Sequence, residues 1–250
     1  MDLDKGRRYG TIEDFQNLIK LAQSSPWLHH SGGTICEPTD IPVNKRHLDM
    51  VYAHMRYSDR AFLGSITAPE RFGAEYVDSH CVIMGNFNST SPLVWDGVST
   101  RGIRAYAAAG QGSIHLPFLL GGAVSPLTMP GAIAQCLAES MVGCALTQLV
   151  RPGAPAILGS FLSSMSLRTG SPTFGTPEPA LGSLVMGQIA RRLNMPLRCA
   201  GNFSTSKLPD GQAMTQAMMS MMSAVNGGAN FILHSAGFLD GLLSMSYEKL

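Results

Sequence analysis

The chain has 250 residues, of which 45% are hydrophobic and only 14% are charged. This length is typical of one (β/α)8 barrel, and the small charged fraction indicates a large buried core. The 18 basic and 17 acidic residues nearly cancel. We therefore expect no nucleic-acid partner and no attraction to an anionic membrane.

The sequence also bears on the compartment. No uninterrupted apolar run is long enough to cross a bilayer, and the first residues lack the apolar core of a signal peptide. The five cysteines are scattered without CxxC spacing. This pattern favours reduced thiols in a cytoplasmic protein over a disulfide framework or a metal site.

The first part of the chain carries two helical patterns. Thr11 is a predicted N-cap, and Asp14 stands at the position that completes a capping box. Apolar residues follow at helical spacing until Ser24–Pro26 ends the helix. A second and longer helical pattern covers Val43–Arg60.

A regular alternation of short apolar runs and helical stretches follows. Each run has the length of a buried strand, and strands that alternate with helices favour a parallel sheet. An earlier stretch, Leu28–Cys36, is a candidate seventh strand. The six main runs are Ala61–Ile66, Cys81–Phe87, Ser113–Leu119, Ala156–Phe161, Leu197–Phe203 and Phe231–Ala236.

The later helices have recognisable starts. Pro130 suits the first turn of a helix that continues to Val150, and a similar pattern covers Ala180–Leu193. Asp210 is a predicted cap for Gly211–Val225. Methionines line one side of this last helix, which is more typical of core packing than of a binding surface: Met214, Met218, Met221 and Met222.

The predicted fold class is α/β, a (β/α)8 TIM-type barrel that is incomplete. Six or seven strands are visible where eight close a barrel, so we expect the chain to be a fragment. We expect a single domain. Residues 1–60 form an N-terminal helical part with the first barrel unit, and residues 61–250 form the remaining units. Open sheet edges would make such a chain prone to aggregation.

Unusual residues stand where the predicted strands end. Carboxyl ends of parallel strands meet at one rim, so these residues should converge on one pocket. The stretch from Leu162 to Pro179 is long for a connection and is a candidate binding loop. No GxSxG, HExxH or P-loop motif is present. The rim residues are Asn88, His115, Phe161, Phe174, Glu178, Asn202, Lys207 and His234.

Several of these residues have a purely structural alternative. Asn88 could satisfy a turn, and His115 could be a hydrogen-bonded core histidine. Glu178 could lie in a surface loop, and Lys207 could be a solvated residue at the start of a helix. The phenylalanines could simply pack in the core. From the residues alone, the prediction is a barrel enzyme with a polar and aromatic rim.

Longer motifs resemble the trimethylamine methyltransferase family. The resemblance is firm over Asp78–Leu250 and weaker before it. The matching stretches are Asn88–Leu93, Gly121–Ala132, Leu149–Pro155, Phe174–Gly182, Ser206–Asp210, Gly228–Gly237 and Ser246–Lys249.

The resemblance implies a TIM-type barrel whose last strand and N-terminal part are missing from this chain. It also implies transfer of a methyl group from a methylated amine to the cob(I)alamin of a partner corrinoid protein. The cobalamin belongs to the partner and is not permanently bound here. Some family members carry pyrrolysine and use trimethylamine, whereas others lack it and use quaternary amines such as glycine betaine. No pyrrolysine stands in this sequence.

A quaternary amine suits these residues better than trimethylamine does. Its ammonium group can be held by aromatic faces and a carboxylate, for which Glu178 and Glu248 are candidates. A betaine carboxylate needs donors, for which His115, Asn202, Lys207 and His234 are candidates. The alternatives are trimethylamine, with pyrrolysine outside this chain, and a truncated barrel that only binds the corrinoid protein. A homo-oligomer is possible.

Overall fold

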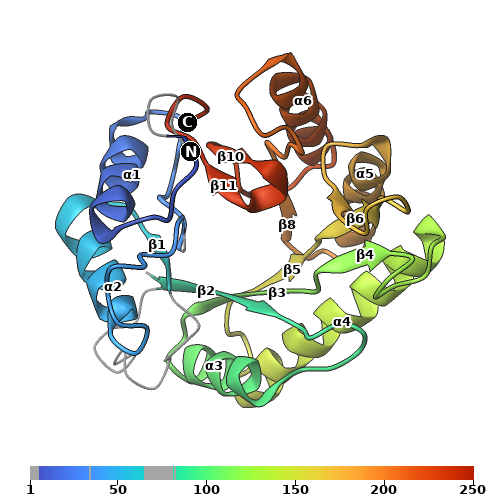
Figure 1. Ribbon diagram of the computed structural model, residues 1–250. Helices are drawn as coiled ribbons and strands as arrows, with labels where there is room; N and C mark the ends of the chain where they lie inside the picture. The colour runs from blue at the N-terminus through green and yellow to red at the C-terminus, as the bar shows by residue number, and fades with distance from the viewer. Residues whose placement is uncertain (1–5, 34, 65–80, 82) are drawn as a thin grey trace.

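The computed structural model describes residues 6–33, 35–64, 81 and 83–250. Within them, six parallel strands form one curled sheet, and the helices surround it on the outside (Figure 1). The strands lie in chain order across the sheet, each beside the next. They are β1 (Phe62–Gly64), β2 (Ile83–Asn88), β3 (Gly112–Leu116), β5 (Ala156–Gly159), β8 (Leu197–Ala200) and β9 (Phe231–Leu233).

A helix connects each pair of neighbouring strands from β2 onward and packs on the outer face of the sheet (Figure 1). This order confirms the predicted alternation, and it is that of a partial β/α barrel. Among the described residues β1 pairs only with β2, and β9 only with β8, so the sheet is open. The helices are α3 (Gly97–Ala108), α4 (Met129–Val150), α5 (Pro177–Arg192) and α6 (Gly211–Asn226).

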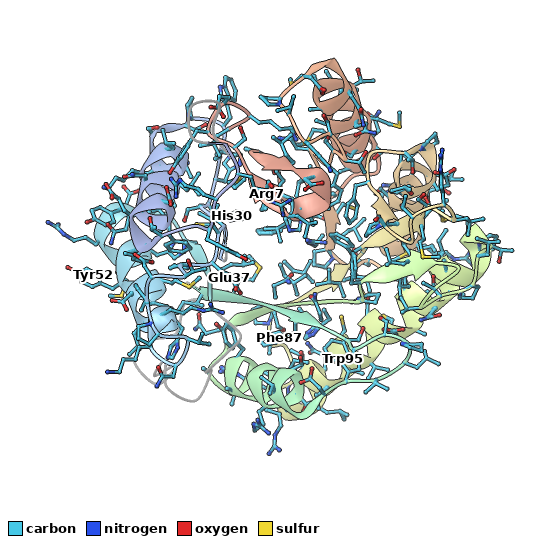
Figure 2. All side chains as sticks on the ribbon, viewed as in Figure 1. Arg7, His30, Glu37, Tyr52, Phe87 and Trp95 are labelled. Atoms are coloured by element: carbon cyan, nitrogen blue, oxygen red, sulfur yellow. The ribbon has the colours of Figure 1, made fainter. Side chains whose placement is uncertain are left out.

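The N-terminal helices lie beside the β1 edge of the sheet. In α1 (Ile12–Ser24) the predicted capping box is confirmed, because Thr11 and Asp14 bond each other's backbone N–H groups. The second helix, α2 (Arg46–Tyr57), is shorter than its pattern predicted. Phe15 and Ile19 of α1 pack against α2, whereas Tyr52 points outward from it (Figure 2).

The candidate strand at Leu28–Cys36 is wrong for its described residues, which form bends and irregular backbone. Gly32 has a φ of +77°, which interrupts an extended chain. The hydroxyl of Ser31 lies 2.8 Å from His54 Nδ1 of α2. This segment is therefore tied to a helix and does not pair with a strand.

Two further small sheets stand above the carboxyl ends of the main strands. β4 (Leu119–Gly121) and β6 (Leu162–Met165) continue in parallel after β3 and β5, and β7 (Pro172–Thr173) pairs with β6. The predicted loop over Leu162–Pro179 therefore contains two short strands and the first turn of α5, joined by turns and irregular backbone. After β9, β10 (Phe238–Leu239) and β11 (Ser244–Met245) form an antiparallel pair.

The sheet has an apolar core on each face. Leu158, Leu197 and Cys199 pack outward against the helices, whereas Ile114 and Ala200 pack inward. Strands that are buried on both faces read as continuous apolar runs, which is the pattern found in the sequence.

Helix α4 is the one described helix that is long and apolar enough to cross a membrane by length and composition. In this fold it packs on β3 and β5, and Ile133, Cys136 and Cys144 on its sheet-facing side are buried. The same composition is common in core helices of folded domains. The helix therefore gives no independent evidence of a membrane.

The methionine stripe of α6 is not core, and that prediction is wrong. Met214, Met218 and Met222 are 61%, 63% and 47% exposed. The buried side of α6 consists of small residues such as Ala213, Ala217 and Ala224, which let the helix approach the sheet closely. Met221 alone turns inward, toward Gly201.

Candidate active site

Six aromatic side chains meet at the carboxyl ends of the strands. Phe161, which follows β5, stands at their centre, with ring centroids 4.9 Å from Phe118, 5.6 Å from Phe174 and 5.3 Å from Phe203. The rings come from the segments that follow β3, β5, β8 and β9, and the parallel sheet brings those segments together. We call these residues the aromatic group: Phe118, Phe161, Phe174, Phe203, His234 and Phe238.

A cavity of about 880 Å³ adjoins the aromatic group between the β1–β2 side and the β9 side of the sheet. His234 and Phe238 of the aromatic group line it, together with Phe231 of β9 and Asn86 of β2. His30 also lines the cavity and stacks on Phe231 with ring centroids 4.6 Å apart, and it lies toward the centre of the molecule in Figure 2. The cavity walls therefore offer several aromatic faces.

Arg198 of β8 is buried directly beneath these rings. It alternates with Leu197 and Cys199, which pack outward, so its side chain lies on the inner face. Nη1 donates to the carbonyl of Ser160 at 3.1 Å, and the guanidinium carbon lies 5.5 Å from the centroid of the Phe161 ring. Its exposed fraction is 1%.

The charge of Arg198 is incompletely matched. Among the described residues its Nε has no hydrogen-bond partner, and no carboxylate forms an ion pair with it. Burial lowers its pKa to about 10, so the guanidinium remains charged at neutral pH. A buried cation without an anion is unfavourable.

His234 joins Arg198 to the cavity. Its Nδ1 lies 3.4 Å from Nη2 of Arg198, and its ring contacts Phe161, Phe203 and Phe238. Burial, and then the neighbouring Arg198 charge, hold the pKa of His234 well below its usual range, so the ring is neutral. Its φ of +59° is unusual for a residue with a side chain.

Asn202 takes part in fixing the segment beyond β9. Its Nδ2 donates to the carbonyl of Ser235 at 2.6 Å. Lys249 donates through Nζ to the carbonyl oxygens of Asn202, at 2.9 Å, and of Phe238, at 2.5 Å. Burial lowers the pKa of Lys249 to about 8. These bonds hold the backbone on both sides of His234.

His115 lies apart from the aromatic group. Its side chain points outward from β3 toward α4, where its Nε2 lies 2.9 Å from Ser113 Oγ and 2.8 Å from Thr147 Oγ1. The residue is fully buried, and burial lowers its pKa to about 4. The structure therefore gives His115 the position of a hydrogen-bonded core histidine.

Four other predicted residues are exposed and also lie outside the aromatic group: Asn88, Glu178, Lys207 and Glu248. Asn88 accepts from Asn86 Nδ2 at 3.2 Å, and Glu248 accepts from Ser246 at 2.5 Å. Glu178 stands in the first turn of α5, where a hydrogen bond from Thr176 is the main cause of its lowered pKa. Of the nine predicted residues, Phe161, Phe174 and His234 come together.

Arg198 is the main residue that sequence reasoning missed. It stands in an apolar strand, Leu197–Ala200, that was recognised as buried. A charged side chain within such a strand is itself a signal, because arginine is rarely buried without a partner. The signal indicates that Arg198 is buried, but it does not tell on which face of the sheet its side chain lies.

The described residues form no cluster that would hold a metal, and three buried thiols are unreactive. No three or more His, Cys, Asp or Glu side chains gather there as a metal site would need. Burial raises the pKa of Cys136 and Cys144 to about 12 and that of Cys199 to about 11. These thiols are protonated at neutral pH, and the thiolate is the reactive form.

The fold and the site define a class: a parallel α/β sheet of barrel type with an aromatic, ligand-sized site at its strand ends. The chain belongs to the trimethylamine methyltransferase family, because the family model described as "Trimethylamine methyltransferase (MTTB)" matches residues 1–250.

Similar proteins carry three different names. A glycine betaine methyltransferase of Desulfitobacterium hafniense is 37% identical over 99% of this chain and 54% of its own length. A proline betaine:corrinoid methyltransferase of Eubacterium limosum is 28% identical over 98% of the chain and 55% of its own length. A trimethylamine methyltransferase of Methanosarcina mazei is 32% identical over 64% of the chain and 32% of its own length. The chain thus spans about half the length of the first two.

Proposed function

We propose that this protein takes part in moving a methyl group from a quaternary amine to the cob(I)alamin of a corrinoid protein, and that glycine betaine is the favoured amine. The observation that carries the proposal is the aromatic group beside the cavity, in a chain of this family. The names of the glycine betaine and proline betaine relatives support the substrate class.

Aromatic faces suit an ammonium group that has no N–H donors. Such a cation is attracted to the negative face of a ring, and the attraction is stronger away from water. Phe231 and Phe238 line the cavity, and His234 between them is neutral. The rings of Phe231 and Phe238 would hold the methyl-bearing nitrogen, while Phe161 and Phe203 exclude water.

The reaction needs positioning more than proton transfer. A quaternary nitrogen leaves as a neutral tertiary amine when a nucleophile takes one methyl group, so no protein acid is required. Holding the methyl carbon in line with its acceptor is the main contribution that the protein can make. The corrinoid is a second substrate that its own protein carries, and no residue of this chain is assigned to hold it.

Trimethylamine is the second candidate, and some relatives bear its name. At neutral pH it is protonated and carries an N–H that needs an acceptor. The aromatic group offers only His234 as an acceptor, and its Nδ1 already faces Arg198. This arrangement favours a quaternary amine. A barrel that only binds the corrinoid protein remains the third hypothesis.

Several wider predictions rest on the whole protein. We propose that the open sheet belongs to an eight-stranded barrel, because the chain covers 54% of the glycine betaine relative. The division at residue 60 into a first part and later barrel units, the cytoplasmic location and a homo-oligomer stay predictions. Each concerns the assembled protein.

A methyl-transfer assay tests the proposal. The chain, and any longer product of its gene, is mixed with reduced cob(I)alamin and one amine, and methylcobalamin formation is followed by absorbance. The amines are glycine betaine, proline betaine, carnitine, choline and trimethylamine. Turnover with a betaine is expected. Turnover with trimethylamine and no other amine would show that trimethylamine is the substrate. Folded protein that turns over none of the amines would favour a barrel that only binds the corrinoid protein.

A further inference from the structure

The positive charge of Arg198, beneath the aromatic group, has no negative partner among the described residues. Arg198 is buried, and the described residues supply it with one carbonyl, one imidazole nitrogen and one ring face. Its Nε is left without a partner. Natural proteins rarely bury an arginine in this way, and the missing element is a negative charge.

His234 lies between this charge and the cavity. Its Nδ1 has no proton when it accepts from Arg198 Nη2, so the proton of the neutral ring is on Nε2. Among the described residues Arg198 is the only hydrogen-bond partner of His234. The ring lines the cavity, so its second nitrogen is available as a donor to a ligand there.

The backbone holds His234 in an unfavourable conformation. Its φ is +59°, and the following residue accepts a 2.6 Å hydrogen bond from Asn202, which itself has a φ of +53°. Positive φ in residues with side chains concentrates at functional sites. Two such residues at the ends of neighbouring strands fix the direction of the imidazole.

We infer that His234 and Arg198 form the subsite for the substrate's carboxylate: Nε2–H of His234 donates to it, and Arg198 fixes that tautomer and supplies the compensating positive charge. The inference rests on the proposed function and narrows the substrate class to N-methylated amino acids, which carry a quaternary ammonium and a carboxylate. His234 touches the substrate, and Arg198 is a positioning residue.

The geometry of the two subsites agrees with such a zwitterion. His234 contacts Phe238 with ring centroids 5.2 Å apart, so the donor and a cation-binding ring are neighbours on the cavity wall. A betaine separates its two charges by one or a few carbon atoms. One molecule can therefore meet the aromatic face and the imidazole at once.

Binding of glycine betaine and choline to the chain separates this role from a structural one. Both ligands carry the trimethylammonium group, but only glycine betaine carries a carboxylate. We expect the unmodified chain to bind glycine betaine about tenfold or more tighter than choline in calorimetric titrations at fixed ionic strength. Equal affinities would overturn the inference and leave the proposed function intact, whereas no binding of either would overturn both.

Two variants test the residues. The first is His234→Asn, because asparagine adopts a positive φ and its side-chain oxygen can accept from Arg198. The substitution removes the Nε2–H donor. Arg198→Met removes the charge at similar length. Each substitution should lower the affinity for glycine betaine about 10- to 100-fold and change the affinity for choline less than about threefold. Equal weakening of both ligands would show a structural role and overturn the inference.

A conservative variant and a spectroscopic readout complete the test. Arg198→Lys should recover part of the preference for glycine betaine, and Arg191→Met is the matched control, because Arg191 bonds the Gly227 carbonyl away from the cavity. In ¹⁵N spectra the His234 ring should show the Nε2–H tautomer in the unmodified chain and a mixture in Arg198→Met. An Nδ1–H tautomer in the unmodified chain would contradict the proposed donor.

Discussion

Two buried histidines, one on each side of the sheet, show how the molecule separates packing from binding. His115 lies in the layer between β3 and α4, where two hydroxyl groups bond its Nε2. His234 lies on the inner side at the end of β9, beside a cavity of about 880 Å³. Both rings are neutral because burial lowers their pKa. Only the second has room for a ligand.

The difference lies in the neighbours and not in the histidine itself. A β-carbon on Gly143 would stand 2.6 Å from Nδ1 of His115, so the outer layer has no spare volume. Nδ1 of His115 also lacks a hydrogen-bond partner, but it faces Gly143 and does not line the cavity, whereas on the inner side Asn86 Oδ1 and Arg198 Nε lack partners among the described residues. Tight packing indicates a structural role, whereas unmatched polar atoms beside a cavity indicate a binding role.

Gly143→Ala, in the tightly packed outer layer, should cause the largest loss of stability. The added methyl group meets three atoms of the His115 side chain, Nδ1, Cγ and Cβ, within 2.8 Å, and the buried side chain cannot move aside. We expect a loss of about 3 kcal/mol in the free energy of unfolding, measured by urea denaturation. Gly211→Ala is the control, because nothing lies within 4 Å of a β-carbon there. Similar losses in both variants would contradict the tight outer layer.

Acidification should cause the next largest loss of stability, through protonation of His115 in the outer layer. Burial lowers the pKa of His115 to about 4 in the folded chain from its ordinary value of 6.5, so the unfolded chain binds more protons between these two pH values. Its contribution is complete above pH 6.5 and is lost as the pH falls toward 4, by on the order of 2 kcal/mol at pH 5. His54 shifts in the same direction. Urea midpoints from pH 7 to 5 measure the loss, which should shrink in His115→Asn.

The same substitution at both histidines sharpens the comparison. His115→Asn should lower the free energy of unfolding by about 2 kcal/mol, because it leaves Ser113 and Thr147 without their partner in a closed layer. His234→Asn should lower it by less than about 1 kcal/mol, because asparagine tolerates the positive φ. Thermal unfolding of the two variants side by side measures this difference, and the reverse order would refute it.

The smallest effect is expected at the cap of α1. Thr11 Oγ1 accepts from Asp14 N at 3.2 Å as part of the capping box, so Thr11→Ala should cost about 1 kcal/mol in urea denaturation. Glu13→Ala is the matched control, because Glu13 is exposed in the same turn and has no capping role. Equal losses in the two variants would contradict a specific contribution of the capping box.

Local pattern predicted most of the framework. The six main strands and the capped starts of α1 and α6 follow from periodicity and caps that a short stretch of sequence contains. The segment Leu28–Cys36 was wrongly predicted as a strand, because its apolar residues contact α1 and α2 and do not pair in a sheet. Tertiary contacts decided that segment.

The candidate site was harder to predict than the fold. His115 and His234 carry the same sequence signal, a histidine in or after an apolar strand. In a strand buried on both faces, nearly every residue is apolar, and no alternation of polar and apolar residues marks the two faces. The sequence pattern therefore does not reveal which side chains point inward. The same ambiguity concealed Arg198, whose face became clear only from its neighbours Leu197 and Cys199.

The hydrogen bond from Tyr247 to Asp14 has a consequence for synthesis. The two residues are 233 positions apart, and Arg7 and Asp240 form a second contact with the same separation. At roughly 5–20 residues per second, a ribosome needs about ten to fifty seconds to make the chain between them. During that time the first helix is outside the ribosome without its final partner, and chaperones can reach it before the fold is complete.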